Sequence, residues 1–289
     1  DSGTQVPVPV VREGTAALDL QSRGGMLISG DWVTNGIDQL GLRAQGDLML
    51  QGASSTVFSG SLATAGDLAI EARQVYPGTQ TRFEIDASGR DVRISRPDGV
   101  GTAESPLSAG GQLVVDAATI TQGGTVRAPQ GRIELRGTES VTLGAGSQTS
   151  VSAAGLVLPY GNSAGGRWLA PDRTVITATP GKRVDLQAPE VTVSDGASVD
   201  LGGGGDLVAY EFVPGRGGST DVFAGGNGAY ALVPRVHTAA SYDPTLAGAA
   251  ALGRQIEIGA GAPLPAGTYT LLPARYALQP GAYLVEPVK

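Results

Sequence analysis

A short apolar stretch opened by glycine recurs through the first half of the chain at nearly constant spacing. The six copies lie at residues 25–28, 46–50, 66–70, 89–94, 111–115 and 131–135. Their glycines are 21, 20, 23, 22 and 20 residues apart. A period of this length is typical of a solenoid, in which one coil cannot bury its own apolar side, so neighbouring coils must stack. This repeat constrains the fold more than any other feature.

The residues inside the repeat alternate in the way that strands require. In the stretch from Ile133 to Leu135, the two apolar side chains fall on one face of a strand and Glu134 falls on the other. No window of a dozen residues keeps helical spacing without an internal glycine or proline. Each coil of roughly 20 residues has room for two or three strands. The sequence therefore predicts an all-β fold, a parallel β-helix.

Composition decides what can fill the core of such a fold. The chain has 289 residues, of which 41% are hydrophobic and only 5% aromatic, so Val, Leu, Ile and Ala must form the core. Small branched side chains suit a narrow β interior. Glycine is abundant at 45 residues, but it has no Gly-X-Y period, which excludes collagen.

Charge and cysteine content limit the partners and the compartment. The net charge is −7 and the basic residues are scattered, which argues against nucleic acid as a partner. The absence of cysteine fits a chain that is exported through an oxidising space. No apolar run is long enough for a transmembrane helix. We interpret the opening Asp1-Ser2-Gly3 as a boundary, which predicts that the chain is a piece of a longer protein.

The period predicts three regions. Residues 1–201 are expected to form the β-helix, with a protruding insertion at 155–180. Residues 202–254 are expected to be an irregular subdomain outside the helix. Residues 255–289 return to strand patterns separated by Pro-Gly and Pro-Ala turns, and they predict a small antiparallel β cap. We expect this cap to cover one end of the rod and to protect its open edge.

The aromatic residues outside the regular repeat are the candidates for binding. Tyr160, Arg167 and Trp168 lie together in the insertion, and Tyr210 and Tyr242 lie in the irregular subdomain. Aromatic residues and arginine dominate interface hot spots, and aromatic rings also stack on sugars. The alternative is that these side chains clamp the insertion onto the rod or fill small satellite cores.

Four acidic residues in the later part of the sequence make a polysaccharide-active enzyme an alternative interpretation. Asp185, Glu190, Asp195 and Asp200 lie five residues apart. On one outer face of a β-helix they could form the paired carboxylates that polysaccharide lyases and glycosidases use. The alternative is a solvated acidic face that keeps the rod soluble.

Other motifs do not support catalysis, a metal or a cofactor. Residues 161–165 fit the G-x-S-x-G pattern, but no helix follows to form a nucleophile elbow. His237 is the single histidine, and without cysteine a zinc site would need carboxylates for every other ligand. We therefore predict no catalytic residue, no bound metal and no cofactor.

Three segments carry a family resemblance. The coils from 120 to 135 resemble the repeats of filamentous-haemagglutinin-like large exoproteins, and the blocks at 199–215 and 264–278 are similar to blocks in the C-terminal part of such proteins. The resemblance implies a right-handed parallel β-helix, secreted by a Gram-negative bacterium through an outer-membrane partner transporter. It also implies that the transporter is engaged by an N-terminal domain absent from this chain.

Together these features predict a secreted or bacterial cell-surface adhesin segment. It would act by surface binding and as a rigid rod, in attachment, aggregation or cell contact. Its expected partner is a receptor or glycan on a host or bacterial cell. The alternatives are a polysaccharide-active β-helix enzyme (a lyase or glycosidase) and a purely structural spacer.

Overall fold

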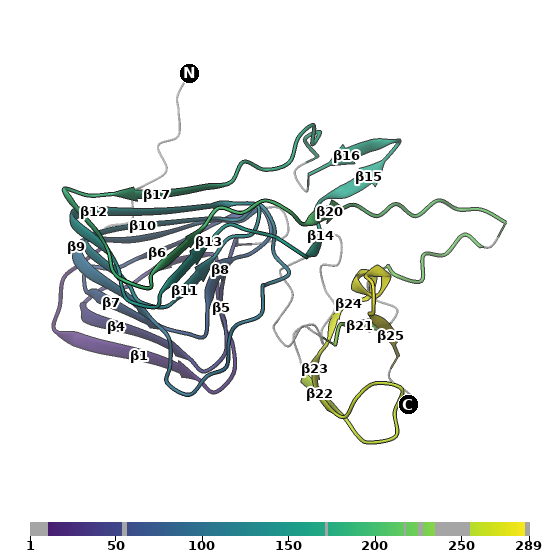
Figure 1. Cartoon of the computed structure of the whole chain (residues 1–289), viewed down its shortest axis with the longest axis horizontal. Coiled ribbons are helices and arrows are strands. Elements are labelled where there is room, and N and C mark those ends of the chain that lie inside the picture. Colours follow the sequence, from purple (N-terminus) through teal and green to yellow (C-terminus); the bar gives the residue numbers. More distant parts are fainter. Residues whose placement is uncertain are drawn as a thin grey trace.

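A computed structural model describes residues 11–53, 57–170, 173–216, 218–224, 228–234 and 255–286. These residues form an all-β fold with large parallel sheets, as the sequence predicted (Figure 1). The described part also contains a short 3₁₀ helix, η2 (Ala274–Leu278). None of its helices combines the length and the apolar character needed to cross a membrane.

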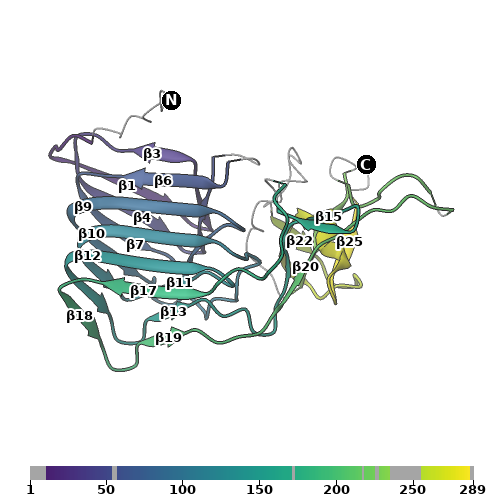
Figure 2. The same ribbon diagram turned by 90° about the horizontal axis from the view of Figure 1, so that it is seen from above.

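Most strands belong to a stack in which parallel strands fall into three rows. The first row contains β3 (Asp31–Val33), β6 (Ser59–Ala63), β9 (Arg82–Ser95), β10 (Gln112–Gln122), β12 (Arg132–Leu143) and β17 (Arg183–Gln187). Figure 2 shows these strands lying beside one another in chain order. The first row uses only the first half of the long strands β9, β10 and β12.

The second and third rows complete the stack. The second row contains β1 (Ala16–Ser22), β4 (Ile37–Ala44), β7 (Asp67–Glu71), the second halves of β9, β10 and β12, and β18 (Glu190–Val193). Because the long strands belong to both rows, the first two rows form one 10-stranded sheet. The third row is a separate 6-stranded sheet of β2 (Met26–Ser29), β5 (Leu48–Gln51), β8 (Val75–Pro77), β11 (Thr125–Arg127), β13 (Gln148–Ser150) and β19 (Ser198–Asp200).

The chain visits the rows in turn, and each visit pairs in parallel with the visit before it. We call one circuit of the rows a pass. This pairing is compatible with a β-helix. Parallel register also aligns side chains, so that residues at equivalent positions form columns through the stack.

These columns form the main hydrophobic core. In the second row, consecutive partners Leu40, Leu68, Val92, Ile120 and Val141 are all at most 2% exposed. The first row contributes a column in which Phe83, Leu113 and Ile133 are fully buried. The expected aliphatic interior is therefore present, and it extends from pass to pass. Two inward positions are polar: Gln122 and Thr149 are fully buried, and the Gln122 amide donates to the Thr149 hydroxyl at 3.0 Å.

The glycine-opened stretches all lead into strands, but not into the same row. Gly25 and Gly46 precede third-row strands, Gly66 precedes a second-row strand, and Gly111 and Gly131 precede first-row strands. Gly89 lies inside β9, just before its second-row half. Successive second-row partners, which mark the true length of each pass, are Leu18, Leu40, Leu68, Val92, Ile120 and Val141. The length of a pass thus varies between 21 and 28 residues. The glycine spacing is more constant than the pass length because successive glycines stand before strands of different rows.

One pass has no third-row strand. After β9 the chain forms a loop, residues 96–111, and β8 pairs directly with β11 through Val75 and Val126. The loop is nevertheless well packed, because Leu107 is 3% exposed and Ala109 is fully buried. It covers the outer side of the third row.

A polar network fixes this loop. The Gln74 side-chain amide donates to the backbone oxygen of Glu104 at 2.7 Å and to Asp47 at 2.7 Å. Arg73 donates to the other Asp47 oxygen at 2.7 Å, and Arg127 donates to the backbone oxygen of Ala103 at 2.9 Å. Asp47 is 5% exposed, so these bonds replace the water that its carboxylate lost on folding.

The remaining strands form a side unit, which we define as β14–β16, β20–β25 and η2. Its strands are β14 (Val157–Pro159), β15 (Asn162–Ala164), β16 (Arg167–Leu169), β20 (Asp206–Val208), β21 (Tyr230–Leu232), β22 (Gln255–Ile258), β23 (Gly267–Thr270), β24 (Leu272–Pro273) and β25 (Tyr283–Val285). β14 and β20 are parallel, whereas β15–β16, β22–β23 and β24–β21–β25 are antiparallel.

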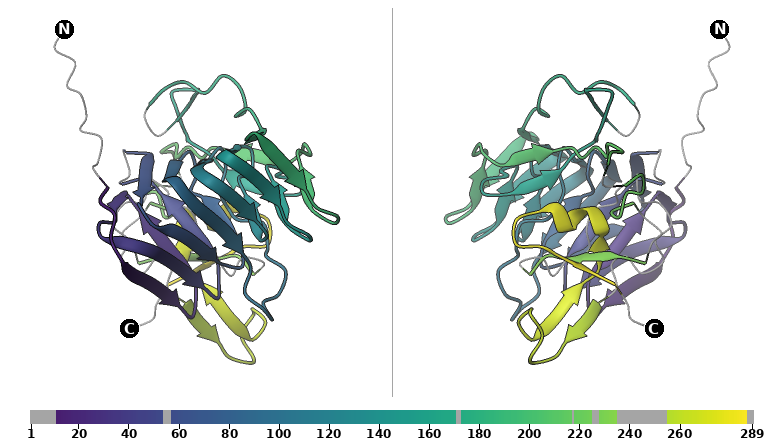
Figure 3. Two further views of the ribbon diagram at one scale, coloured as in Figure 1. Left: turned by 90° about the vertical axis from the view of Figure 1, so that its left-hand side faces the viewer. Right: turned by 90° about the vertical axis from the view of Figure 1, so that its right-hand side faces the viewer.

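The side unit lies beside the stack, and not over its end as we expected for the C-terminal strands. Figure 3 (right) looks onto the side unit with the stack behind it. Leu272 and Tyr276 are buried in one cluster with Leu107 and Ala109 of the 96–111 loop. The loop offers the C-terminal strands an apolar surface at the flank. Val193 in the last pass remains 56% exposed.

Candidate functional site

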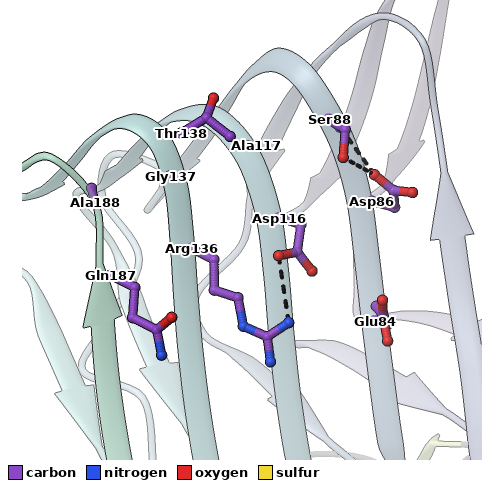
Figure 4. Close-up of a pocket in the computed structure, with 10 residues that line it drawn as sticks. All are labelled: Glu84, Asp86, Ser88, Asp116, Ala117, Arg136, Gly137, Thr138, Gln187 and Ala188. Atoms are coloured by element: carbon purple, nitrogen blue, oxygen red, sulfur yellow. Dashed lines mark hydrogen bonds and ion pairs between the residues drawn. The ribbon is translucent and has the colours of Figure 1, made fainter.

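A groove with a volume of about 440 Å³ lies on the outer side of the first row. It lies where β9, β10 and β12 bend from the first row into the second, and β17 contributes its other side (Figure 4). Its lining is Glu84, Asp86, Ser88, Asp116, Ala117, Arg136, Gly137, Thr138, Gln187 and Ala188.

Strand register explains why these side chains meet. Asp86, Asp116, Arg136 and Gln187 are consecutive partners on β9, β10, β12 and β17, so they form one outward column. In the neighbouring outward column, Val114 separates Glu84 from Glu134. The groove therefore combines a carboxylate pair on adjacent strands with an arginine on the next strand.

Arg136 is the electrostatic centre of the groove. Its guanidinium lies 3.5 Å from the Asp116 carboxylate and forms a short hydrogen bond with Glu134. Figure 4 shows its side chain extending towards Asp116. The hydrogen bond with Glu134 is the main reason that the pKa of Arg136 is raised, with Asp116 adding to the effect and burial opposing it. The Asp86 carboxylate is bound instead by the Ser88 hydroxyl at 2.6 Å.

The pKa of Asp116, a carboxyl group that lines the groove, is raised above its ordinary value. Burial raises the pKa of Asp116, the nearby carboxylates Glu84 and Asp86 raise it further, and Arg136 lowers it. The net direction is upward. A carboxyl group that holds its proton more firmly than usual can donate a hydrogen bond or a proton to a ligand in the groove.

This arrangement suits a polar ligand rich in hydroxyl groups. Carboxylates accept hydrogen bonds from hydroxyls, and the arginine, the threonine and the glutamine side chain can donate to ligand oxygens. Among the described residues, no group of three or more His, Cys, Asp or Glu side chains could hold a metal ion.

The aromatic residues of the predicted insertion form a second feature of interest. The rings of Tyr160 and Trp168 meet edge to face, with centroids 6.1 Å apart and planes at 89°. The Trp168 indole N–H donates to the backbone oxygen of Tyr160 at 2.6 Å. Both side chains are partly buried, and Tyr160 packs against the side unit's core. This contact corresponds to the clamping alternative, while one side of the pair remains open to solvent.

A tight hairpin presents the neighbouring arginine. β15 and β16 pair through Ser163 and Trp168, and the turn between them, Gly165-Gly166, has positive φ at both residues, which glycine adopts without strain. Arg167 follows this turn and is exposed. The Ser163 hydroxyl donates to Glu211 at 2.9 Å, which ties the hairpin to the segment that follows β20.

The other two predicted binding residues are not brought into this pair. Tyr210, next to Glu211, is partly buried, and burial raises the pKa of its hydroxyl. Tyr242 and His237 lie outside the described residues. The binding role of all five predicted residues stays a prediction.

The four late carboxylates do not gather on one face. Asp185 lies in β17 and forms an ion pair with Arg183 at 2.5 Å, Glu190 begins β18, and Asp195 lies in the turn that follows. Asp200 ends β19, which belongs to the other sheet. The series from Asp185 to Asp200 passes through all three rows of the last pass, so the carboxylates point in different directions.

Sequence reasoning missed the groove because it aligned the wrong stretches. The residues Ile85-Asp86-Ala87, Val115-Asp116-Ala117 and Leu135-Arg136-Gly137 occupy equivalent positions in the first row. The glycine spacing instead aligns the stretch at 89–94 with 111–115, although residues 89–94 lead into the second row. An alignment that paired Phe83 with Leu113 would have placed the two aspartates side by side.

Comparisons with known proteins do not identify a family or a function for this chain. No protein family, no curated protein and no solved structure matches the chain.

Proposed function

We propose that this chain is a segment of a secreted or cell-surface bacterial adhesin, a rigid rod that presents a binding surface. Its partner is a receptor or glycan on a host or bacterial cell. Export uses an outer-membrane transporter that recognises a domain outside this chain. The single observation that carries the proposal is the stack of parallel passes around continuous aliphatic columns, with a separate side unit attached to its flank.

The finer fold belongs to the same proposal. We infer a right-handed parallel β-helix, because the three rows are visited in turn and each pairs with its own previous visit. The family resemblance of the coils supports the same hand. Such a stack needs no disulfide, since burying its columns contributes roughly 25 cal/mol for each Å² of apolar surface removed from water.

The hairpin of the side unit is the proposed contact surface. It combines exposed Arg167 with the partly exposed Tyr160–Trp168 pair, and these residue types dominate interface hot spots. The experiment is to measure binding of the labelled 289-residue protein to epithelial and bacterial cells and to a glycan array. Arg167→Glu should weaken binding by about tenfold or more.

A matched variant controls for charge. Arg23→Glu makes the same change at an exposed turn at the far end of the stack, and we expect it to bind like the wild type. Equal binding by all three proteins would reject the hairpin as the contact surface. Binding by a variant that lacks residues 155–180 would favour the spacer alternative for this segment.

The groove favours a second candidate, a polysaccharide-active enzyme. The observation behind it is the raised pKa of Asp116 beside Asp86 and Arg136. Incubation with acidic and neutral glycans should then release reducing ends or unsaturated products, and Asp116→Asn should abolish this release. Asp98→Asn, at an exposed loop position away from the groove, is the control. No release from any glycan by the wild type would leave the adhesin proposal alone.

A further inference from the structure

Three first-row strands begin with the same outward pattern, an arginine followed two residues later by an acid. The pattern lies at residues 82–84 on β9, 132–134 on β12 and 183–185 on β17. The register aligns the three arginines in one column, with Gln112 of β10 between the first two. Their side chains lie on the outer face, because the residue after each of them packs in the core. We call this set the arginine column; it is Arg82, Gln112, Arg132 and Arg183.

In two of the three strands, the arginine forms an ion pair with its own acid. The Arg82 guanidinium lies 3.2 Å from Glu84, and the Arg183 guanidinium lies 2.5 Å from Asp185. The arginine side chains are 46% and 62% exposed, respectively. Ion pairs that are open to water in this way are weak. Arg183 therefore remains able to bind a further anion.

The third strand differs, because its acid is bound elsewhere. Glu134 forms its short hydrogen bond with Arg136, two residues further along β12. Within the described part of the chain, the side chain of Arg132 has no ion pair and no hydrogen bond. Arg132 is exposed, and a Cβ on Gly181 would lie 3.8 Å from its Nη2 atom, so its guanidinium extends towards the residues that lead into β17. Arg136 thus leaves Arg132 available to an anion.

Arg132 and Arg183 are direct partners on neighbouring strands. Strands of one sheet lie about 4.8 Å apart, and like charges directly opposite each other repel. An anion bound between the two guanidinium groups removes this repulsion. A carboxylate fits best, because its two oxygens accept two parallel hydrogen bonds from the planar guanidinium.

The arginine pair lies at the end of the first row that adjoins the hairpin. A Cβ on Gly110 would lie 2.8 Å from the Tyr160 ring and 3.2 Å from the Pro180 ring. Gly110 and Pro180 come two and three residues before β10 and β17, respectively. The aromatic pair of Tyr160 and Trp168 therefore stands where the strands of the arginine column begin.

We propose that Arg132 and Arg183 bind the carboxylate of an acidic sugar, whose ring lies towards the Tyr160–Trp168 pair. This inference rests on the proposed function, because it names the chemistry of the glycan that the adhesin segment binds. Arg136 is a positioning residue, since it binds Glu134 and so keeps Arg132 unpaired. A terminal sialic acid and a uronate within a chain both present such a carboxylate, and separate probes distinguish the two sources.

Calorimetric titration of the 289-residue protein tests the chemistry of the ligand. The acidic probes are sialyllactose and trigalacturonate, and their uncharged counterparts are lactose and methyl-esterified trigalacturonate. We expect at least one acidic probe to bind and its counterpart not to bind at the same concentration. Failure of both acidic probes to bind would overturn the proposal. Equal binding of sulfated lactose, which has no carboxylate, would overturn it too, because it would indicate a general attraction of anions.

Substitutions locate the site. Arg132→Gln removes half of the arginine pair and should weaken binding of the acidic probe at least about tenfold. Arg132→Lys keeps the charge but lacks the planar guanidinium, so it should recover only part of the affinity. Arg93→Gln is the matched control, because Arg93 is an exposed outward arginine in the second-row half of β9, and it should bind like the wild type. Equal affinity of Arg132→Gln and the wild type would reject the site. Unchanged circular dichroism and melting temperature verify that each variant is folded.

A pair of variants tests the positioning role of Arg136. Arg136→Gln releases Glu134, which can then pair with Arg132, so binding should weaken by up to about fivefold although the ligand does not contact position 136. Adding Glu134→Gln removes the competing carboxylate and should restore the wild-type affinity. A role of Arg136 in the fold alone would weaken binding equally in the single and the double variant, and that result would overturn the positioning role.

Binding to cells separates this inference from the proposed function. If the wild type and Arg132→Gln bind cells equally well, the acidic sugar is not the receptor group, while the adhesin proposal stands. If the wild type binds an acidic probe but no cell, the site stands and the adhesin proposal fails.

Discussion

The stack and the side unit solve the problem of burying apolar surface in different ways. In the stack, register makes each pass cover the next, and the core is a set of aliphatic columns in which Phe83 is the only aromatic ring among the core side chains described. In the side unit, short strands converge from distant parts of the sequence, and Tyr269 and Tyr276 help to fill two small clusters.

The difference lies in what positions a side chain. In the stack, a residue needs only its place in the repeat, since its neighbours are the same positions one pass away. In the side unit, Leu107 meets Leu272 across more than 160 residues of chain, and no periodicity places them together. Repeat stability should therefore depend on nearest neighbours, whereas side-unit stability should depend on a few specific contacts.

The largest effect is expected from a charge inside a column. Ile133 is fully buried between Leu113 and Val184, so Ile133→Asp should destabilise the stack by more than about 4 kcal/mol, because an unpaired carboxylate would lose its water. Thermal unfolding by circular dichroism measures the loss. Secretion by the native host should fall too, if export depends on folding.

Thr142→Asp provides the matched control for that variant. Thr142 lies on β12 as Ile133 does, but it occupies an outward column with Thr121 and Thr192. We expect a melting temperature close to that of the wild type. Equal losses in the two variants would mean that inward and outward positions are not distinguished, which contradicts the columnar core.

A smaller effect is expected in the side unit. Tyr276 is 2% exposed in the cluster that joins η2 to the 96–111 loop, so Tyr276→Ala should cost about 3 kcal/mol. Hydrogen exchange should show faster exchange in β21 and β24 and unchanged protection in β9 and β10. Leu284→Ala, at a side chain that is 40% exposed, should change neither. Equal loss of protection in the stack would show that the two regions unfold as one unit.

The polar network that holds the 96–111 loop on the stack should contribute less. Asp47→Ala removes the acceptor of Arg73 and one of the two acceptors of Gln74. It should cost about 2 kcal/mol, because the arginine keeps partial access to water and Gln74 keeps its bond to Glu104. Urea unfolding measures this cost, and proteolysis within 96–111 should become faster. Asp98→Ala, exposed in the same loop, should leave both unchanged. Identical urea unfolding curves for Asp47→Ala and the wild type would show that this network does not contribute to stability.

The smallest effect is expected from pH at the groove. The pKa of Asp116 is raised above its ordinary value of 3.8, so the folded protein binds this proton more tightly than the unfolded chain. The contribution of Asp116 to stability is therefore largest below that value and is lost as pH rises through the raised pKa. Relative to the wild type, Asp116→Asn should gain stability between acidic and neutral pH. A constant difference across this range would contradict the raised pKa.

The sequence predicted the parts of the fold that repeat. Alternation at Ile133 and Leu135 correctly identified inward positions, and each glycine-opened stretch leads into a strand. The row of each strand could not be read from the spacing, since Gly66 and Gly111 precede strands of different rows. Passes of unequal length can have nearly regular glycine spacing. Only the strand with which each stretch pairs shows to which row it belongs.

The candidate site was predictable only in part. The aromatic residues of the insertion were recognised from composition, but the edge-to-face contact of Tyr160 and Trp168 depends on the hairpin register. The groove depends on lateral neighbours, because Asp86 and Asp116 are 30 residues apart and become adjacent only when β9 pairs with β10. The flank position of the C-terminal strands depends on the 96–111 loop, whose burial leaves no periodic signal.

The pass without a third-row strand has a mechanical consequence. Between β7 and β10, and between β6 and β10, the first two rows contain β9, whereas β8 and β11 are direct neighbours. One side of the molecule is thus shorter there by one strand spacing, about 4.8 Å. A stack that is shorter on one side can keep its strand pairing by bending towards that side, so we expect the long axis to curve at this level.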